Sequence, residues 1–199
     1  AQTNSITLNS NATILVDPQQ PVPIQRAAED LASDMNKVFG TAPKIVASES
    51  QAGPVSIVLG DAGVGAAPAD HDSKPEAFSI TSSGSKPEVI RLAGSDMRGT
   101  LYAIYLFSQD YLGVDPMYYW TDHQPVKCRS IEIPAALDKK FPAPVFRYRG
   151  FFINDEDLLT GWASGEAKDH SGISLAIWNK IYETILRLKG NMVVAGTWP

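Results

Sequence analysis

Residues 147–157, which read RYRGFFINDED, are the most informative segment of this 199-residue chain. An apolar strand here runs directly into an amide, Asn154, and three consecutive acids, of which Asp155 and Glu156 come first. In parallel α/β folds, ligands bind outside the carboxyl ends of the strands, where the loops begin. Three adjacent carboxylates also repel one another, so at least one needs a partner or a shifted pKa. The segment predicts either a functional site at a strand end or a solvated acidic loop that caps the next element.

Two arginines and a tryptophan flank these acids. Arg147 and Arg149 lie two positions apart and therefore share one face of the expected strand, which extends over residues 145–153. Arginines on such a strand need either acidic partners in the protein or an anionic ligand. Trp162 lies in a polar loop expected over residues 154–172, where it is either a platform for a sugar ring or a lid over the strand ends.

Beyond this segment the pattern is that of one βαβ unit. Residues 174–189 carry apolar side chains at helical spacing, Gly190 ends that helix, and residues 191–195 begin a second strand. A single βαβ unit has no closed core of its own. We therefore expect residues 141–199 to open a larger parallel α/β domain.

The first 135 residues alternate short strands with two helices. Apolar positions three and four apart predict one helix from Ile24 to Gly40 and another from Asp96 to Gly113. Strands are expected at residues 6–8, 12–16, 44–47, 55–59, 77–81, 89–92 and 117–120. This pattern predicts a β-rich α/β sandwich with helices on at least one face. Residues 134–144 have the composition of an exposed linker, so the predicted domains are 1–140 and 141–199.

Composition and charge exclude several classes of protein. Hydrophobic residues make up 44% of the chain and charged residues 20%, which is ordinary globular composition rather than disorder or coiled coil. The net charge of −5 argues against a nucleic-acid-binding surface, and no apolar run reaches the roughly 18 residues that a membrane span needs. Cys128 has no second cysteine for a disulfide, and the three histidines are scattered. We expect no metal site, no cofactor, no nucleic-acid partner and no membrane partner.

The amino-terminal sequence favours secretion. The chain begins with Ala1 rather than with a methionine, and no apolar signal segment follows. This is the pattern of a mature chain after removal of its signal peptide. Asn11-Ala12-Thr13 is an acceptor pattern for N-glycosylation. We therefore expect a secreted, extracellular protein that carries a glycan on Asn11.

Two further segments of the first domain have alternative interpretations. Residues 60–65 follow a strand and are rich in glycine, which suggests a phosphate-binding turn, but the glycine spacing favours a plain loop. The aromatic residues at 118–120 are either a carbohydrate platform or a packing surface between domains. Asp122 follows these aromatic residues and is a candidate for contact with the mouth of the second domain.

Several motifs resemble those of one known family. They are FRYRGFFINDE (146–156), GW (161–162), WNKIY (178–182) and LRLKGN (186–191), preceded by RGTLYAIY (98–105), YWTD (119–122) and Pro125. In this order and at this spacing they resemble glycoside hydrolase family 115, the xylan α-1,2-glucuronidases. The resemblance covers residues 85–199 with definite motifs and residues 1–84 in general pattern alone. It implies a hexosaminidase-like amino-terminal α/β domain followed by the first βαβ unit of a TIM (β/α)8 barrel.

The family resemblance implies hydrolysis that removes glucuronic acid, or its 4-O-methyl ether, from glucuronoxylan with inversion. Inverting enzymes use a carboxylic acid and a carboxylate about 6.5–9.5 Å apart, which leaves room for water. Asp155 and Glu156 match the family's first active-site motif as catalytic candidates that contact sugar hydroxyls or the water, and Asn154 as a hydrogen-bonding residue. Adjacent residues cannot easily flank one glycosidic bond from opposite faces, so other essential carboxylates are expected from later strands.

The resemblance also implies a substrate that is itself an anion, which needs cationic or N–H donors. Arg149, Trp162 and Asp122 are the further candidate substrate-binding residues. The expected partners are glucuronoxylan and acidic xylo-oligosaccharides, and a homodimer is one option for the assembly. Because most of the barrel strands are not among these residues, we expect this chain alone to be a truncated and inactive part of the enzyme.

Two alternatives stay open. The first is another TIM-barrel glycosidase such as a β-hexosaminidase, because that type of preceding domain is shared. The second is a non-catalytic carbohydrate-binding or structural module, in which the first domain acts alone.

Overall fold

The computed structural model describes residues 5–60, 73–153, 156–167 and 173–194. The chain divides into two compact units, Ala1–Pro144 and Val145–Pro199, and each is described by itself. The α/β class predicted from the sequence is confirmed, because both units combine strands with helices. In the part of the chain that is described, no helix is long and apolar enough to cross a membrane.

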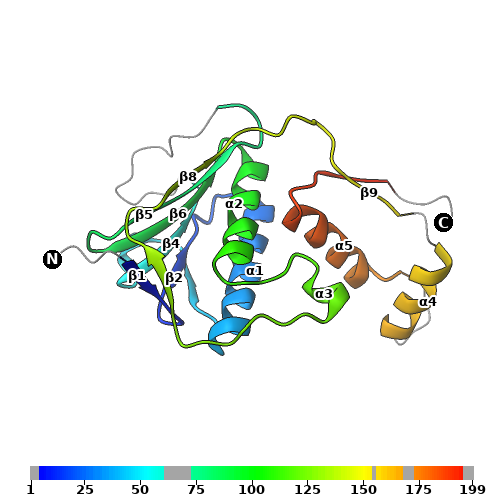
Figure 1. Ribbon diagram of the computed structural model, residues 1–199, viewed down its shortest axis with the longest axis horizontal. Coiled ribbons are helices and arrows are strands. Elements are labelled where there is room, and N and C mark those ends of the chain that lie inside the picture. Colours follow the sequence, from blue (N-terminus) through cyan, green and yellow to red (C-terminus); the bar gives the residue numbers. More distant parts are fainter. Residues whose placement is uncertain (1–4, 61–72, 154–155, 168–172, 195–199) are drawn as a thin grey trace. The chain divides into compact units, whose positions relative to one another are not determined.

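Unit 1 is built around a six-stranded sheet (Figure 1). In spatial order the strands are β3 (Lys44–Val46), β2 (Thr13–Leu15), β4 (Val55–Leu59), β6 (Glu88–Gly94), β5 (Phe78–Ser83) and β8 (Asp138–Phe141). The first four run parallel, whereas β5 is antiparallel to both of its neighbours. Ile14, Ile57 and Ile90 lie in register across the centre of the sheet, and all three are fully buried. A short 3-10 turn, η1 (Glu49–Gln51), connects β3 to β4.

Two long helices, α1 (Val22–Phe39) and α2 (Met97–Asp110), pack side by side against one face of this sheet (Figure 1). The predicted apolar face of α1 is buried, and the helix ends at Gly40, whose φ of 79° is left-handed. The close approach of α2 to β6 requires glycine at position 94. A Cβ atom on Gly94 would overlap the main chain of Gly99 at the start of α2. The sheet and the two helices together enclose the core of unit 1.

Residues 134–144 do not form the linker that their composition predicts. Within them lies β8, which pairs with β5, and Phe141 stacks on Phe78 with 4.5 Å between the ring centroids. Lys139 and Lys140 are exposed on this strand and give it the composition of a linker. Edge strands carry such charges because their outer side faces water. The prediction was therefore wrong, and the segment completes the sheet.

A separate two-stranded sheet joins the beginning of unit 1 to its end. β1 (Ser5–Leu8) pairs antiparallel with β7 (Ile131–Pro134). The Glu132 carboxylate accepts hydrogen bonds from the hydroxyls of Ser5 at 2.6 Å and Thr7 at 2.9 Å. These two bonds lower the pKa of Glu132. Because the partner strands are more than a hundred positions apart in the sequence, local pattern could not indicate the pairing.

The aromatic residues at 117–120 form a helical turn, not the predicted strand. α3 (Tyr118–Thr121) ends at Asp122, whose φ of 54° is left-handed. The main-chain N–H and the hydroxyl of Thr121 both donate to the Met117 carbonyl, at 3.1 Å each. Aromatic residues fit a strand by β-propensity, but that preference depends on neighbouring strands, and here local hydrogen bonds close a turn instead.

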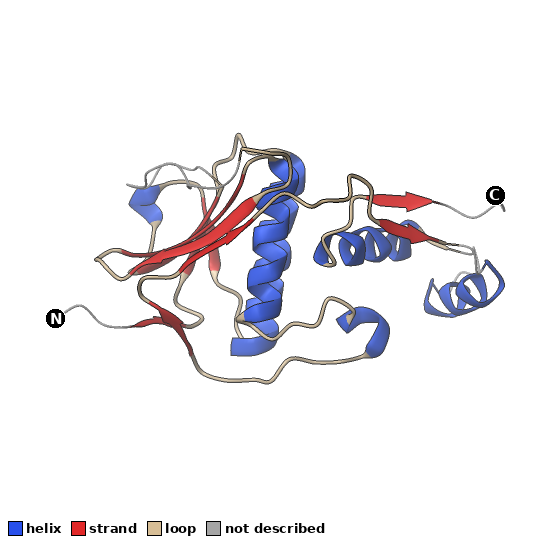
Figure 2. Cartoon of the chain, turned by 45° about the horizontal axis from the view of Figure 1, so that its top comes forward, coloured by secondary structure: helices blue, strands red, loops and turns tan. Residues whose placement is uncertain are grey.

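The described residues of unit 2 form two parallel strands, drawn as neighbouring red arrows in Figure 2, and two helices. β9 (Gly150–Phe152) pairs with β10 (Met192–Val194), and α4 (Glu156–Ala167) and α5 (Leu175–Arg187) lie between them in the chain. Ser174 caps α5, because its hydroxyl accepts the Ile177 N–H at 3.3 Å.

Two predictions for unit 2 need correction. The expected loop over residues 154–172 contains α4. Leu159 and Ala163, four positions apart, share one face of this helix, and Ala163 is fully buried. The expected strand over residues 145–153 is reduced to β9; directly before it, the Arg149 main chain bonds to the side chain and the main chain of Asn191.

Candidate functional site

The acid-rich segment follows the carboxyl end of β9. Ile153, the last described residue before the acids, donates its N–H to the Val194 carbonyl at 2.8 Å, so the carboxyl ends of β9 and β10 are neighbours. Asn154 and Asp155 lie outside the described residues, and so does the side chain of Glu156, whose main chain begins α4. The predicted roles of these three residues stay predictions.

Arg149 lies at the opposite, amino end of β9. Its guanidinium donates from Nε to the Lys189 carbonyl at 2.9 Å and from Nη1 to the Phe146 carbonyl at 2.6 Å. Four residues of extended chain, about 13 Å, separate Arg149 from Ile153. Both of these hydrogen bonds go to main-chain carbonyls of unit 2, and the predicted contact of Arg149 with a substrate stays a prediction.

Trp162 lies in the middle of α4 rather than in a loop, and 42% of its surface is exposed. Leu158, four positions earlier on the same face of the helix, is 74% exposed. Both predicted roles for Trp162, stacking on a sugar ring and covering the strand ends, require an apolar face that is open to the surroundings. The helix supplies such a face in unit 2.

A charged cluster of three residues occupies one side of α5. Glu183 bonds to Lys180 at 2.7 Å and to the fully buried Arg187 at 2.8 Å. Burial alone would raise the pKa of Glu183, but the two cations outweigh it and hold this pKa below its ordinary value. The cluster keeps a buried carboxylate ionised and stabilises α5.

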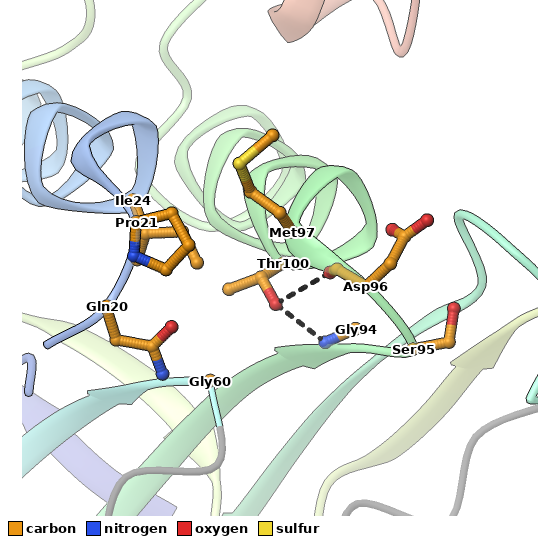
Figure 3. Close-up of a pocket in the computed structure, with 9 residues that line it drawn as sticks. All are labelled: Gln20, Pro21, Ile24, Gly60, Gly94, Ser95, Asp96, Met97 and Thr100. Carbon is orange, nitrogen blue, oxygen red and sulfur yellow. Dashed lines mark hydrogen bonds between the residues drawn. The ribbon is translucent and has the colours of Figure 1, made fainter.

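A hollow of about 160 Å³ lies in unit 1 at the carboxyl ends of β4 and β6 (Figure 3). Gly60 and Gly94 border it from these two strands, Gln20 from the turn before α1, and Asp96 and Thr100 from the start of α2. Parallel α/β sheets bind ligands at this kind of position, so the chemistry of the lining residues decides what the hollow can hold.

The polar groups of this hollow bond to neighbouring main chain. The Asp96 carboxylate accepts the N–H groups of Gly99 at 2.7 Å and Glu76 at 3.2 Å. The Thr100 hydroxyl accepts the Gly94 N–H and donates to the Asp96 carbonyl (Figure 3). A carboxylate at the amino end of α2 opposes binding of phosphate there. Apart from Gly60, the segment 60–65 lies outside the described residues, so the plain loop predicted there stays a prediction.

An ion pair between a buried glutamate and an exposed arginine joins the residues just before β5 to the start of α2. Glu76, nearly fully buried and at a left-handed φ of 68°, contacts the Arg98 guanidinium at 2.6 Å. Hydrogen bonding to Glu76 raises the pKa of Arg98. Glu76 and Arg98 lie 22 positions apart, and nothing in the local sequence indicates that they pair.

The remaining candidates belong to unit 1. Asp122 is exposed and ends α3, and the Lys37 ammonium lies 4.5 Å from the centre of the Tyr118 ring on the same small helix. Cys128 donates its main-chain N–H to the Val38 carbonyl at 3.0 Å, at the end of α1. Among the described residues, no three His, Cys, Asp or Glu side chains gather in a way that could hold a metal ion.

Comparison with known proteins adds to this geometry. Residues 142–199 match the family model of glycosyl hydrolase family 115, and this range contains all of unit 2. The resemblance to family 115 is confirmed. A solved family 115 4-O-methyl-α-glucuronidase, with specificity for decorated arabinogalactans, is 28% identical to this chain, with a TM-score of 0.78. The match covers 96% of this chain and 26% of that enzyme, so the chain spans about a quarter of the length of this family 115 structure.

Two solved structures of Streptomyces plicatus β-hexosaminidase are also similar to this chain. One is a mutant with the product GlcNAc (12% identity, TM-score 0.53), and the other holds thio-NAglucal (12% identity, TM-score 0.52). Each match covers 96% of this chain and 31% of the hexosaminidase chain. At this identity the likeness shows a shared fold alone. A search of curated protein sequences found no match.

Proposed function

We propose that this chain is the amino-terminal part of a glycosidase that removes glucuronic acid, or its 4-O-methyl ether, from a polysaccharide. The observation that carries the proposal is the family 115 match over residues 142–199, which contains the Asn154-Asp155-Glu156 run. The 28% identity and TM-score of 0.78 to a 4-O-methyl-α-glucuronidase support the same conclusion over nearly the whole chain.

In this proposal, unit 2 is the first βαβ unit of a TIM (β/α)8 barrel. Its two strands are parallel, and helices lie between them in the chain, as the barrel requires. Large apolar side chains on both strands are exposed, namely Phe151, Phe152, Met192 and Val194. In a closed barrel, neighbouring strands, helices and the packed interior bury such side chains. Their exposure here supports a unit that other parts of a larger enzyme would cover.

The proposed site forms at the carboxyl end of β9, where barrel enzymes hold their catalytic residues. We assign Asp155 and Glu156 to contacts with sugar hydroxyls or with the attacking water, and Asn154 to hydrogen bonding. An inverting pair needs about 6.5–9.5 Å between its carboxyl groups, which adjacent residues do not easily provide. Other essential carboxylates then come from later strands, and one of the pair needs a pKa raised by its surroundings to act as the acid. This chain alone is accordingly expected to be inactive.

The proposed substrate is glucuronic acid carried as a side chain on a neutral polysaccharide. The family resemblance predicts glucuronoxylan as the backbone, whereas the solved relative has specificity for decorated arabinogalactans. The uronic acid is the element common to both. A polysaccharide substrate also suits a secreted enzyme, and Asn11 is exposed in the turn between β1 and β2, where a glycan is sterically accessible.

The test uses the intact enzyme that contains this chain, with glucuronoxylan and glucuronic-acid-decorated arabinogalactan as substrates. We expect release of uronic acid from one or both. Asp155→Asn and Glu156→Gln are expected to lower turnover by about 10²–10⁴-fold with little change in thermal stability. Asp157→Asn is the matched control, because this third acid lies just outside the motif FRYRGFFINDE (146–156) that carries the family resemblance.

Three results would contradict the proposal. Absence of uronic acid release from both polysaccharides removes the activity. Release of GlcNAc from a chitobioside instead would favour a hexosaminidase. Near-normal turnover of both Asp155→Asn and Glu156→Gln would remove these residues from the site.

A further inference from the structure

The amide of Asn191 bridges two residues that precede β9. Its Oδ1 accepts the Arg149 main-chain N–H at 3.0 Å, and its Nδ2 donates to the Arg147 carbonyl at 2.8 Å. The main-chain N–H groups of Asn191 and Met192 both donate to the Arg149 carbonyl, at 2.7 and 3.1 Å. A side chain thus takes the place of a neighbouring strand and extends the pairing of β9 and β10 toward their amino ends.

The Arg149 side chain adds a further hydrogen bond between the segment before β9 and the segment before β10. Its Nε donates to the Lys189 carbonyl at 2.9 Å. Lys189 has a left-handed φ of 59° and donates its N–H to the Leu186 carbonyl, in the turn that ends α5. Arg149 therefore ties the end of α5 and the approach to β10 to the start of β9. We call Arg149, Lys189 and Asn191 the clasp.

Two glycines allow the clasp to close. A Cβ atom on Gly150 would overlap the Met192 carbonyl, and one on Gly190 would meet the Ile185 side chain at 2.8 Å and the Arg149 carbonyl at 3.1 Å. The Arg149-Gly150 and Gly190-Asn191 pairs are therefore two halves of one contact between segments some 40 positions apart in the chain. Each glycine allows the main chain of the other segment to approach closely.

The clasp determines how β9 lies against β10. The two strands pair over three residues each, from Gly150 opposite Met192 to Phe152 opposite Val194. A ladder this short provides few hydrogen bonds to define its register, and a slip of one residue would turn every side chain to the other face. The hydrogen bonds at the amino ends select this one register. The same register sets where the carboxyl end of β9 lies.

We propose that Arg149 and Asn191 are positioning residues of the glycosidase site. They hold the register of β9 against β10, and thereby the point from which the chain continues to Glu156 at the start of α4. In this role Arg149 acts through the strand rather than by binding the uronate. Its guanidinium donates to two main-chain carbonyls, about 13 Å of extended chain from the last residue before the acids. The effect on activity rests on the proposed function; the effect on strand pairing does not.

The experiment compares four variants of the intact enzyme: Arg149→Met, Arg149→Lys, Asn191→Ala and, as the matched control, Arg147→Met. The Arg147 side chain is exposed, and its guanidinium carbon lies 5.2 Å from the centre of the neighbouring Tyr148 ring. Two readouts are taken at a temperature well below unfolding. One is kcat and KM for uronic acid release, and the other is hydrogen exchange of the amides of Ile153 and Met192.

We expect Arg149→Met and Asn191→Ala to lower kcat by about 10–100-fold while KM changes by less than about threefold, because a small misplacement of the site costs rate rather than binding. Exchange at Ile153 and Met192 should accelerate by about tenfold or more, since the hydrogen bonds that order them are weakened. Arg149→Lys keeps one donor and should recover part of the loss. Arg147→Met should match the wild type in both readouts.

Three outcomes would overturn the proposal. A KM at least tenfold higher with kcat retained in Arg149→Met would make Arg149 a substrate-binding residue. Unchanged exchange at Ile153 and Met192, or a lower melting temperature with unchanged kcat, would leave the clasp without a positioning role. If the wild-type enzyme releases no uronic acid, the proposed function fails, and exchange in the same variants still decides whether the clasp holds the strands.

Discussion

The sheets of the two units differ in how far they are covered. In unit 1, Ile57, Ile90 and Leu92 on the central strands are 0% exposed. In unit 2, Phe151 and Phe152 on β9 are 44% and 57% exposed, and Leu175 at the start of α5 is 74% exposed. Burial of apolar surface is the main favourable term in folding. The difference therefore assigns most of the stability of this chain to unit 1. In unit 2, exposed apolar side chains lie on both the strands and the helices.

The largest expected effect comes from separating the units. Residues 1–144 expressed alone should unfold in one cooperative transition, with a free energy of unfolding of about 5 kcal/mol or more in urea. Residues 145–199 alone should show no cooperative transition, because a two-stranded sheet is marginally stable at best without further cover. Circular dichroism during urea titration measures both. If the fragment of residues 145–199 unfolded cooperatively as a monomer, the assignment of most of the stability to unit 1 would be wrong.

Truncation of one side chain in each sheet compares how much stability the covered and the exposed strands contribute. Ile57→Ala should lower the free energy of unfolding of unit 1 by about 3 kcal/mol, through lost burial and the cavity that remains. Phe152→Ala removes a larger side chain from an exposed position in this chain and should cost less than about 1 kcal/mol. Urea unfolding of the 199-residue chain compares the two variants. Equal losses would mean that β9 is as well covered as the central strands of unit 1.

The Glu183 cluster includes the buried Arg187 of unit 2, and the stability that this cluster gives to α5 should depend on pH. Because Lys180 and Arg187 lower the pKa of Glu183 in the folded chain, the cluster contributes its full stability above the ordinary value of 4.5. That contribution disappears as the pH falls through the lower, folded-state pKa. At pH 7, Glu183→Gln should destabilise α5 by about 2 kcal/mol, since it leaves the buried Arg187 and the partly exposed Lys180 with a neutral partner.

Hydrogen exchange of α5, corrected for the intrinsic rate at each pH, measures this loss of stability. Glu29→Gln, an exposed glutamate on α1, is the control and should leave α5 unchanged. The difference between Glu183→Gln and the wild type should shrink as the pH is lowered below 4.5. A difference that grows toward acid pH would contradict the assigned direction of the pKa.

The smallest effect concerns the cap of α2 in unit 1. Asp96→Ala removes the acceptor for the N–H groups of Gly99 and Glu76 and should cost about 1–2 kcal/mol. Asp110→Ala, at the other end of the same helix, removes an exposed negative charge that is unfavourable there, and should be neutral or slightly stabilising. Thermal unfolding distinguishes them. Equal effects of both variants would show that the Asp96 cap contributes no stability.

Local pattern predicted the core of unit 1 well. The apolar run Val55–Leu59 lies between Pro54 and Gly60, and β4 has those same bounds. The helix expected from Ile24 to Gly40 is α1. It could be predicted because its apolar face and its terminating glycine are both features of the local sequence. Such elements depend on their own residues more than on distant partners.

The parts that local pattern missed depend on distant partners. β8 has the composition of a linker and becomes a strand because β5 offers it an edge. β1 pairs with β7, which lies more than a hundred positions later in the sequence. The contact between Asn191 and Arg149 joins two motifs some 40 positions apart, and neither motif alone shows that the other is its partner. The strand-end position made the acids after Ile153 candidates, and their roles stay predictions, whereas no local pattern indicated that Asn191 bonds to the segment before β9.

The most direct test of the proposed activity is a proton NMR spectrum of the uronic acid in the first minutes of hydrolysis by the intact enzyme. With α-linked glucuronic acid on its polysaccharide as substrate, inversion predicts that the β anomer appears first and the α anomer follows by mutarotation. Initial appearance of the α anomer, or the absence of any released uronic acid, would contradict the proposal that this chain belongs to an inverting glucuronidase.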